Sequence, residues 1–230
     1  SYVYIEVPAG GNGGFREADG SSAFVNVDFG SIRSIHNVES LESDMPLQIR
    51  SCVLREDSGG EGQRRGGLGM RRELRLCEGE ALYSVLGDRA IIPPFGMHGG
   101  GPAKQLSVSW QRGQTVKLFG TPGKVTGHRI QKGDVVIMES AGGGGYGDPL
   151  NRDPEDVRND MLSGYITPHR AEAGYGVLFT GEWEVDDDRT SALRLDMLGR
   201  RLRLTVKADE TYPYIGNRGK RRVVRLSEGT

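Results

Sequence analysis

The sequence predicts an α+β protein that is mainly β, with a sandwich- or barrel-like β core and a short C-terminal helical pair. Short runs of apolar or alternating residues recur through the first 139 positions, separated by glycine-rich turns. Glycine provides 36 of the 230 residues, roughly twice its ordinary share. The clearest helix-start signals come after residue 150. Strands this short and this regularly spaced are typical of a sandwich or a barrel.

Three strands are predicted before residue 56. Tyr2–Val7 alternates in the manner of a half-buried strand, and Ala23–Phe29 follows a glycine-rich break. Pro46–Arg55 is a longer apolar run that reads as a strong strand. Ser31–Asp44 carries apolar residues three apart, which fits either a weak amphipathic helix or an ordered loop.

Five more strands are predicted between residues 68 and 139, after a polar glycine loop at 56–67. Pro93 and Pro94 cannot continue the second of them, because proline has no N–H group to donate to a strand ladder. The five runs are Leu68–Cys77, Ala81–Leu86, Leu106–Gln111, Thr115–Phe119 and Asp134–Glu139.

Two helices are expected, at Pro154–Ser163 and Pro168–Gly174. Asp153 and Thr167 are suitable N-caps, and each is followed by a proline at the first helical position. Gly176 can end the second helix in the left-handed conformation.

The chain divides into three expected regions. Residues 1–150 form a glycine-rich β domain, 151–180 a helical pair, and 181–230 a C-terminal extension that contacts a partner. Within the extension, 190–204 fits either a helix or a pair of strands. The five basic residues of 218–225 fit a solvated or partner-facing tail, or an anion site.

Composition excludes several classes of protein. The net charge is −1, so neither nucleic acid nor a membrane surface is an expected partner. Cys52 and Cys77 make no disulfide framework or zinc pattern, and we expect reduced, buried thiols in a cytoplasmic protein. The sequence lacks an initiator Met and a leader, which suggests a processed small subunit or a piece of a longer chain. The apolar content of 36% predicts that the isolated chain is poorly soluble or partly unfolded.

The densest glycine run is Gly142, Gly143, Gly144 and Gly145, between a predicted strand and a predicted helix. Such a run is kept where the backbone needs a positive φ or another group approaches closely. A strand, glycine loop and helix can also cradle an anion on backbone N–H groups. However, the run lacks the lysine of a P-loop and the G-x-G-x-x-G spacing. A close crossing of backbone segments is the favoured interpretation, with nucleotide binding as the alternative.

Four residues near glycine loops are candidates for lining a site. His98 lies on a glycine-rich loop and is either exposed surface or a proton carrier. Arg64 flanks another such loop and either binds an acidic group or is solvated. Tyr146 and Asp148 follow the glycine run, and Asp148 is equally suited to a turn or cap. No histidine pairs with another His or a Cys at metal-ligand spacing within one element, so a metal site would need ligands from distant loops.

Ordered motifs run through the chain as far as about residue 178. They are Asp57–Gly69 with Arg72–Glu73, Leu86–Arg89 with Pro93–Gly96, Lys132–Asp134 with Gly142–Pro149, and Gly164–Pro168 with Tyr175–Val177. With these motifs the sequence resembles the C-terminal part of the hydantoinase B (HyuB)-type subunit of ATP-dependent hydantoinases and 5-oxoprolinases. The same subunit type occurs in biotin-independent acetone and acetophenone carboxylases.

The resemblance implies a cytoplasmic hetero-oligomeric enzyme. A HyuA-like subunit would bind ATP and activate an amide or enol oxygen, and the hydantoinase B-type chain would help form the site of hydrolysis or carboxylation. The family's metal-binding residues belong to its N-terminal half, which this sequence lacks, so neither a metal ligand nor a catalytic residue is carried over to this chain. ATP and a divalent metal are therefore expected on partner chains, one of which carries that N-terminal half.

Three functions follow from the resemblance. The first is a subunit that helps form the site where a phosphate-activated cyclic amide is hydrolysed, inactive as an isolated chain. The second is a subunit of a biotin-independent ketone carboxylase. The third is a structural subunit without chemistry of its own. Glycine loops that line a cavity shared with a metal or substrate would favour the first two, and glycine loops buried in crossings between subunits would favour the third.

Overall fold

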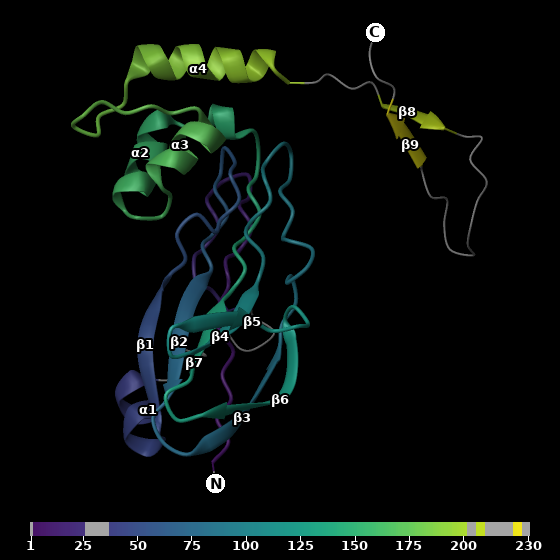
Figure 1. The fold of residues 1–230 in the computed structure, drawn as a ribbon. Coiled ribbons are helices and arrows are strands. Elements are labelled where there is room, and N and C mark those ends of the chain that lie inside the picture. The colour runs from purple at the N-terminus through teal and green to yellow at the C-terminus, as the bar shows by residue number, and fades with distance from the viewer. Residues whose placement is uncertain (1, 26–36, 202–205, 210–222, 227–230) are drawn as a thin grey trace.

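The computed structural model describes residues 2–25, 37–201, 206–209 and 223–226. Over residues 38–199, the strands lie at one end together with the helix at 38–44, long loops run through the middle, and the helices after residue 150 lie at the other end (Figure 1). In chain order the elements are α1 (Val38–Asp44), β1 (Leu47–Leu54), β2 (Met70–Leu76), β3 (Glu80–Leu86), β4 (Ser107–Arg112), β5 (Thr115–Leu118), β6 (Lys124–Gln131), β7 (Val135–Glu139), the 3-10 helix η2 (Pro149–Asn151), α2 (Pro154–Leu162), α3 (Pro168–Tyr175), α4 (Asp187–Gly199), β8 (Val206–Asp209) and β9 (Val223–Leu226).

The strands form an open sandwich. A five-stranded antiparallel sheet has the order β1-β2-β7-β4-β5, and β3 and β6 pair as a separate two-stranded sheet. The central strand β7 buries Val135, Val136 and Ile137 in succession, as expected of a strand covered on both faces. Among the described strands the sheets do not close into a barrel, so the predicted β core is confirmed in its sandwich form.

The core of the sandwich lies between the two sheets. One cluster joins Leu76 and Val136 of the larger sheet to Ile130 of β6, with Tyr83 of β3 packed against it. A second cluster centres on Ala90, Leu106 and Val108, and Tyr83 and Val85 of β3 pack against it. The inward residues of β3 and β6 therefore attach the small sheet to the large one.

The strand predictions between residues 46 and 139 are confirmed to within about three residues at each end. The strand β6 was not predicted, because its residues are mostly polar and Gly127 interrupts them with a φ of 63°. The prediction of a strand at Tyr2–Val7 is wrong, because the segment pairs with no strand in the described part of the chain. Most of Ala23–Phe29 lies outside the described residues, and Phe24 makes only an isolated bridge to Gly10.

Both predicted helices are present. The Asp153 side chain accepts from the N–H of Glu155 and caps α2, and Thr167 caps α3 in the same way. Gly176 ends α3 in the left-handed conformation. For residues 190–204, the helix alternative is correct as far as the end of α4, and residues 202–205 and 210–222 lie outside the described residues. A cluster of apolar side chains joins α2 and α3 and comprises Val157, Ile166, Ala171, Tyr175 and Val177.

The prediction of two buried thiols is wrong for Cys52, which is exposed, while Cys77 is partly buried. Cys52 lies on the edge strand β1 at a position that stays exposed, although its Sγ accepts a hydrogen bond from Arg72 at 3.4 Å. In the part of the chain that the structure describes, the helices are too short or too polar to cross a membrane.

A buried carboxylate stabilises the turn between β6 and β7. Asp134 is 1% exposed and accepts hydrogen bonds from Arg112 at 2.8 and 2.6 Å and from the N–H of Gln131 at 2.9 Å. The hydrogen bonds from Arg112 are the main reason that the pKa of Asp134 is below its ordinary value. Since the unfolded pKa is about 3.9, this stabilisation is fully present only above about pH 5 and is lost as the pH falls through the lower folded pKa.

We therefore expect Asp134→Asn to lower the urea midpoint at pH 7. We also expect the variant to lose less stability than the native chain when the pH falls from 4 to 2. Asparagine keeps the shape of the side chain but carries no charge for Arg112 to stabilise. Urea unfolding followed by tryptophan fluorescence at several pH values measures both effects. An equal loss of stability at low pH in the variant and the native chain would contradict this role of Asp134.

Candidate functional site

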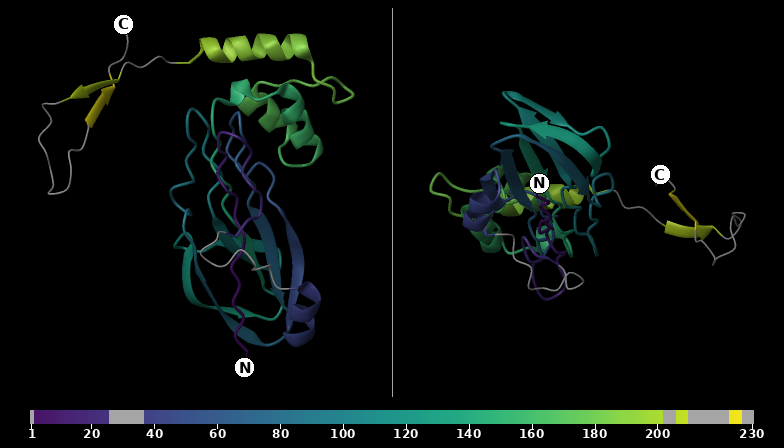
Figure 2. Two further views of the ribbon diagram at one scale, coloured as in Figure 1. Left: turned by 180° about the vertical axis from the view of Figure 1, so that it is seen from behind. Right: turned by 90° about the horizontal axis from the view of Figure 1, so that it is seen from below.

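Six glycine-containing stretches run between the sheets and the helices, and together we call them the glycine bundle. They rise from the sandwich toward α2 and α3, as the views in Figures 1 and 2 agree. Backbone hydrogen bonds join them to one another instead of forming regular helices or sheets. The stretches are residues 10–14, 20–22, 58–62, 64–69, 95–104 and 141–147.

The four-glycine run lies inside this bundle with a period of three residues. A Cβ added at each position would lie 1.8–1.9 Å from a backbone carbonyl oxygen of a neighbouring stretch. Gly142 and Gly145, three residues apart, both face stretch 58–62, whereas Gly143 and Gly144 face two other stretches. Three residues per turn is the repeat of polyproline II and of collagen, where only glycine fits the crowded axis. The oxygens concerned belong to Ser58 for Gly142, Asn12 for Gly143, Phe95 for Gly144 and Glu61 for Gly145.

Close approach of other backbone, and not a positive φ, therefore explains the run. None of the four glycines is among the described residues with positive φ. The N–H groups of Gly142, Gly143 and Gly145 donate to the carbonyls of Lys104, Gly67 and Gly101 at 3.2, 2.9 and 3.0 Å. These donors are engaged inside the bundle and are not available to hold an anion. The interpretation as a tight structural crossing is the one that the geometry supports.

The four predicted site residues gather at the helical end of the bundle. The ring of His98 lies 4.8 Å from the ring of Tyr146, and the backbones of Tyr146 and Arg64 exchange two hydrogen bonds of 2.9 Å. A Cβ on Gly99 would lie 3.7 Å from the backbone nitrogen of Asp148. His98 is exposed and has a φ of 52°, an uncommon conformation for a residue with a side chain. A role of these four residues in a reaction stays a prediction.

Asp148 has the capping role that was its alternative interpretation. It accepts from the N–H of Leu150 at 3.0 Å at the start of η2, and it also pairs with Arg201, whose second nitrogen lies 2.7 Å from Oδ1. The hydrogen bond from Arg201 is the main reason that the pKa of Asp148 is below its ordinary value. Arg201, just after α4, thus contacts the end of the bundle, which the sequence did not indicate.

A buried ion network, also missed from the sequence, ties α2 to the bundle. Asp160 on α2 accepts from Arg65 at 3.1 Å and from Arg152 at 2.8 Å, and all three residues are buried. Arg152 also binds both carboxylate oxygens of Asp19 at 2.7 Å. Burial raises the pKa of Asp160 above its ordinary value, although the two arginines oppose this shift. These charges come from segments far apart in the chain, so no local motif could have indicated them.

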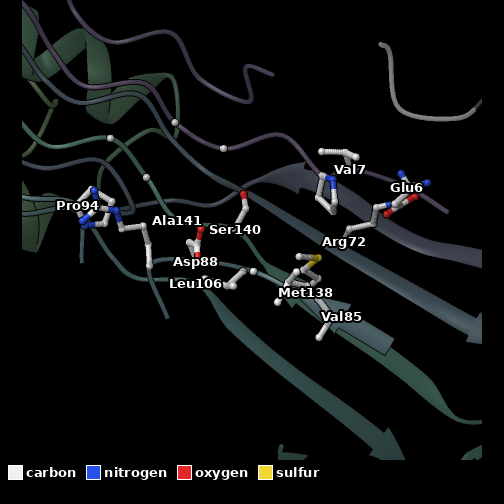
Figure 3. A pocket seen from close by; sticks show the side chains of 18 of the residues that line it. Glu6, Val7, Arg72, Val85, Asp88, Pro94, Leu106, Met138, Ser140 and Ala141 are labelled. Atoms are coloured by element: carbon white, nitrogen blue, oxygen red, sulfur yellow. The ribbon is translucent and has the colours of Figure 1, made fainter. Parts of the chain in front are cut away.

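A cavity of about 1090 Å³ lies at the sandwich end of the bundle, and the glycine run forms part of its wall. Other walls come from residues 3–8, from β3 and the loop after it, and from the faces of β2 and β7 (Figure 3). Most of the lining is apolar, and the buried Arg72 pairs with Glu6 at 2.8 Å. Burial is the main reason that the pKa of both Tyr4 and Tyr83 is raised to about 12, so both tyrosines are protonated near neutral pH.

The cavity and the predicted residues are in different places. His98, Arg64, Tyr146 and Asp148 do not line the cavity, whereas Gly142 to Gly145 do. Across the described ranges, no cluster of three or more His, Cys, Asp or Glu side chains has the arrangement of a metal site. Binding of ATP and a divalent metal by partner chains stays a prediction.

Residues 1–149 match the family model described as Hydantoinase B/oxoprolinase, and this range contains the sandwich and the glycine bundle. The chain belongs to the hydantoinase B/oxoprolinase family. It is 34% identical to the B-type subunit of a D-/L-hydantoinase from a Pseudomonas species, over 84% of this chain and 32% of that protein. It is 28% identical to the acetophenone carboxylase delta subunit of Aromatoleum aromaticum over 69% of this chain and 28% of that subunit.

A related protein of known structure has the same fold. The structure of the ATP-dependent caprolactamase from Pseudomonas jessenii superposes with a TM-score of 0.68 at 28% identity, over 81% of this chain and 33% of that one. The chain thus spans about a third of the length of the curated relatives it matches, 32% in the hydantoinase subunit.

Proposed function

We propose that this chain is the bundle-and-sandwich part of a hydantoinase B-type subunit in an ATP-dependent complex that hydrolyses a cyclic amide. The observation that carries the proposal is that residues 1–149, which form the sandwich and the glycine bundle, match the Hydantoinase B/oxoprolinase family model. The partners proposed are a HyuA-like subunit that binds ATP and a chain that carries the remaining hydantoinase B-type residues.

Similarity favours hydrolysis over carboxylation. The hydantoinase subunit is 34% identical to this chain, against 28% for the carboxylase subunit, and the superposed caprolactamase is named for a cyclic amide.

The glycine run would contribute shape to such a site. Side chains at these positions would displace neighbouring backbone, and glycine lets several stretches meet beside the cavity within a small cross-section. We propose that the bundle is a rigid support for the reaction site, whose reacting groups are supplied by the partner chains.

The test is to purify the complex that contains this chain and to assay it with ATP and hydantoin, 5-oxoproline or caprolactam. We expect ring-opened amino acid and ADP to form together, without any need for bicarbonate. Turnover only with a ketone and bicarbonate would overturn hydrolysis in favour of the carboxylase. The absence of both reactions in an assembled complex would indicate a structural subunit.

A further inference from the structure

The cavity is the unfilled interior of the sandwich. Its floor is the face of the large sheet that carries Arg72, Leu74, Val136 and Met138, and one side is residues 82–89, on β3 and just after it. The small sheet above this floor has two strands against five, so it leaves part of the floor uncovered. Figure 3 shows Met138 and Arg72 on neighbouring strands, with Val85 on a third strand beside them.

One edge of β3 is free beside this cavity. In the described part of the chain β3 pairs with β6 alone, although it has seven residues and runs along the lining. A free edge presents backbone N–H and C=O groups that can pair with another strand. Seven residues span about 23 Å, enough for an added strand of ordinary length.

The border of the cavity is apolar as well as open. Leu82 and Leu86 of β3 are 69% and 83% exposed, and four more lining residues are large, apolar and exposed. Such a concentration around one opening marks an interaction site. The four residues are Val3, Ile5, Phe95 and Met97.

We propose that an extended, alternately apolar segment from the rest of a hydantoinase B-type subunit pairs with the free edge of β3 and fills this cavity. The proposal rests on the function above in that it takes the chain to be part of such a subunit. The added strand would extend the small sheet over the uncovered floor and place every second side chain on Leu74, Val136 and Met138.

Three observations favour this occupant. The volume, about 1090 Å³, exceeds the usual range of about 300–1,000 Å³ for a small-molecule site. The buried cation of the floor, Arg72, is already paired with Glu6, which suits apolar side chains better than an anion. The hydantoinase relative has about two-thirds of its length without a counterpart here, since this chain covers 32% of it.

The full chain is to be co-expressed with the polypeptide of the same organism that matches the uncovered part of hydantoinase B-type relatives. Hydrogen exchange then compares residues 80–86 of β3 with residues 115–118 of β5, which is also an edge strand. We expect at least tenfold slower exchange in β3 on complex formation and little change in β5. Unchanged exchange in β3, or failure of the two chains to associate, would overturn the proposal.

Substitution tests the apolar border. Leu82→Lys with Leu86→Lys should weaken the complex at least tenfold, while Leu118→Lys on β5, at 73% exposure, should leave its affinity within about twofold. The circular dichroism and melting temperature of each variant show that it is folded, and hydrogen exchange of the native pair gives an answer without any variant. Equal weakening by both changes would refute the assignment of this edge.

Two other outcomes have definite meanings. Protection of β3 that increases with the concentration of this chain alone would show that a second copy occupies the edge, and would overturn the proposal. A complex that protects β3 but opens no cyclic amide with ATP would overturn the proposed function and leave this interface standing, because neither readout here involves turnover.

Discussion

Gly144→Val is expected to prevent the glycine bundle from folding and the enzyme complex from assembling. A Cβ at this position would lie 1.9 Å from the carbonyl oxygen of Phe95 and 2.6 Å from its carbonyl carbon. The obstacle is backbone, which cannot rotate away as a side chain can, so the cost should exceed the usual range of about 1–3 kcal/mol for overpacking. Domains are stable by only about 5–15 kcal/mol, so most of this margin would be lost.

The measurement is urea unfolding of the variant and its co-purification with partner chains. Gly181→Val is the matched control, because no heavy atom lies within 4 Å of a Cβ there. Tyr146→Phe keeps the ring beside His98 and should also assemble. Normal stability and assembly of Gly144→Val would show that the stretches of the bundle can separate at little cost, and the central role given to the run would be wrong.

Arg152→Met is expected to destabilise the chain by about 3–5 kcal/mol, which is the usual cost of removing one partner from a buried ion network. Arg152 is 3% exposed and binds Asp19 and Asp160 together. Burial lowers its pKa, but the hydrogen bonds to Asp19 and the charge of Asp160 outweigh this and raise the pKa above its ordinary value. Methionine preserves much of the volume and removes the charge, so it would leave Asp19 without its bidentate partner.

Urea unfolding again measures the change, with Arg158→Met on the same helical pair as the control. Arg158 pairs with Glu155 and Glu184, whose side chains are 57% and 59% exposed, so its loss should cost no more than about 1 kcal/mol. Similar costs for the two changes would mean that the buried network contributes no more than a surface pair. In that case α2 would be attached to the bundle mainly by its apolar contacts.

Local sequence signals were sufficient to predict the elements whose backbone conformation is decided by neighbouring residues. The prolines and caps at Asp153 and Thr167 place α2 and α3 to within about a residue, because a helix end is satisfied by groups a few positions away. A continuous apolar run likewise identified β7, and apolar residues at alternate positions identified most of β1. The strand β6 was not predicted, since it is polar and is defined by its pairing with β3.

The amino-acid sequence by itself determined the mainly β class, the helical pair and the motifs that relate the chain to its family. It also showed that Gly142 to Gly145 had to meet other backbone or adopt a positive φ. Only the tertiary structure decided between these two, because the obstructing oxygens belong to residues between 49 and 131 positions away in the chain. The cavity, the free edge of β3 and the ion network around Asp160 were invisible for the same reason: each is assembled from distant segments whose meeting no local pattern records.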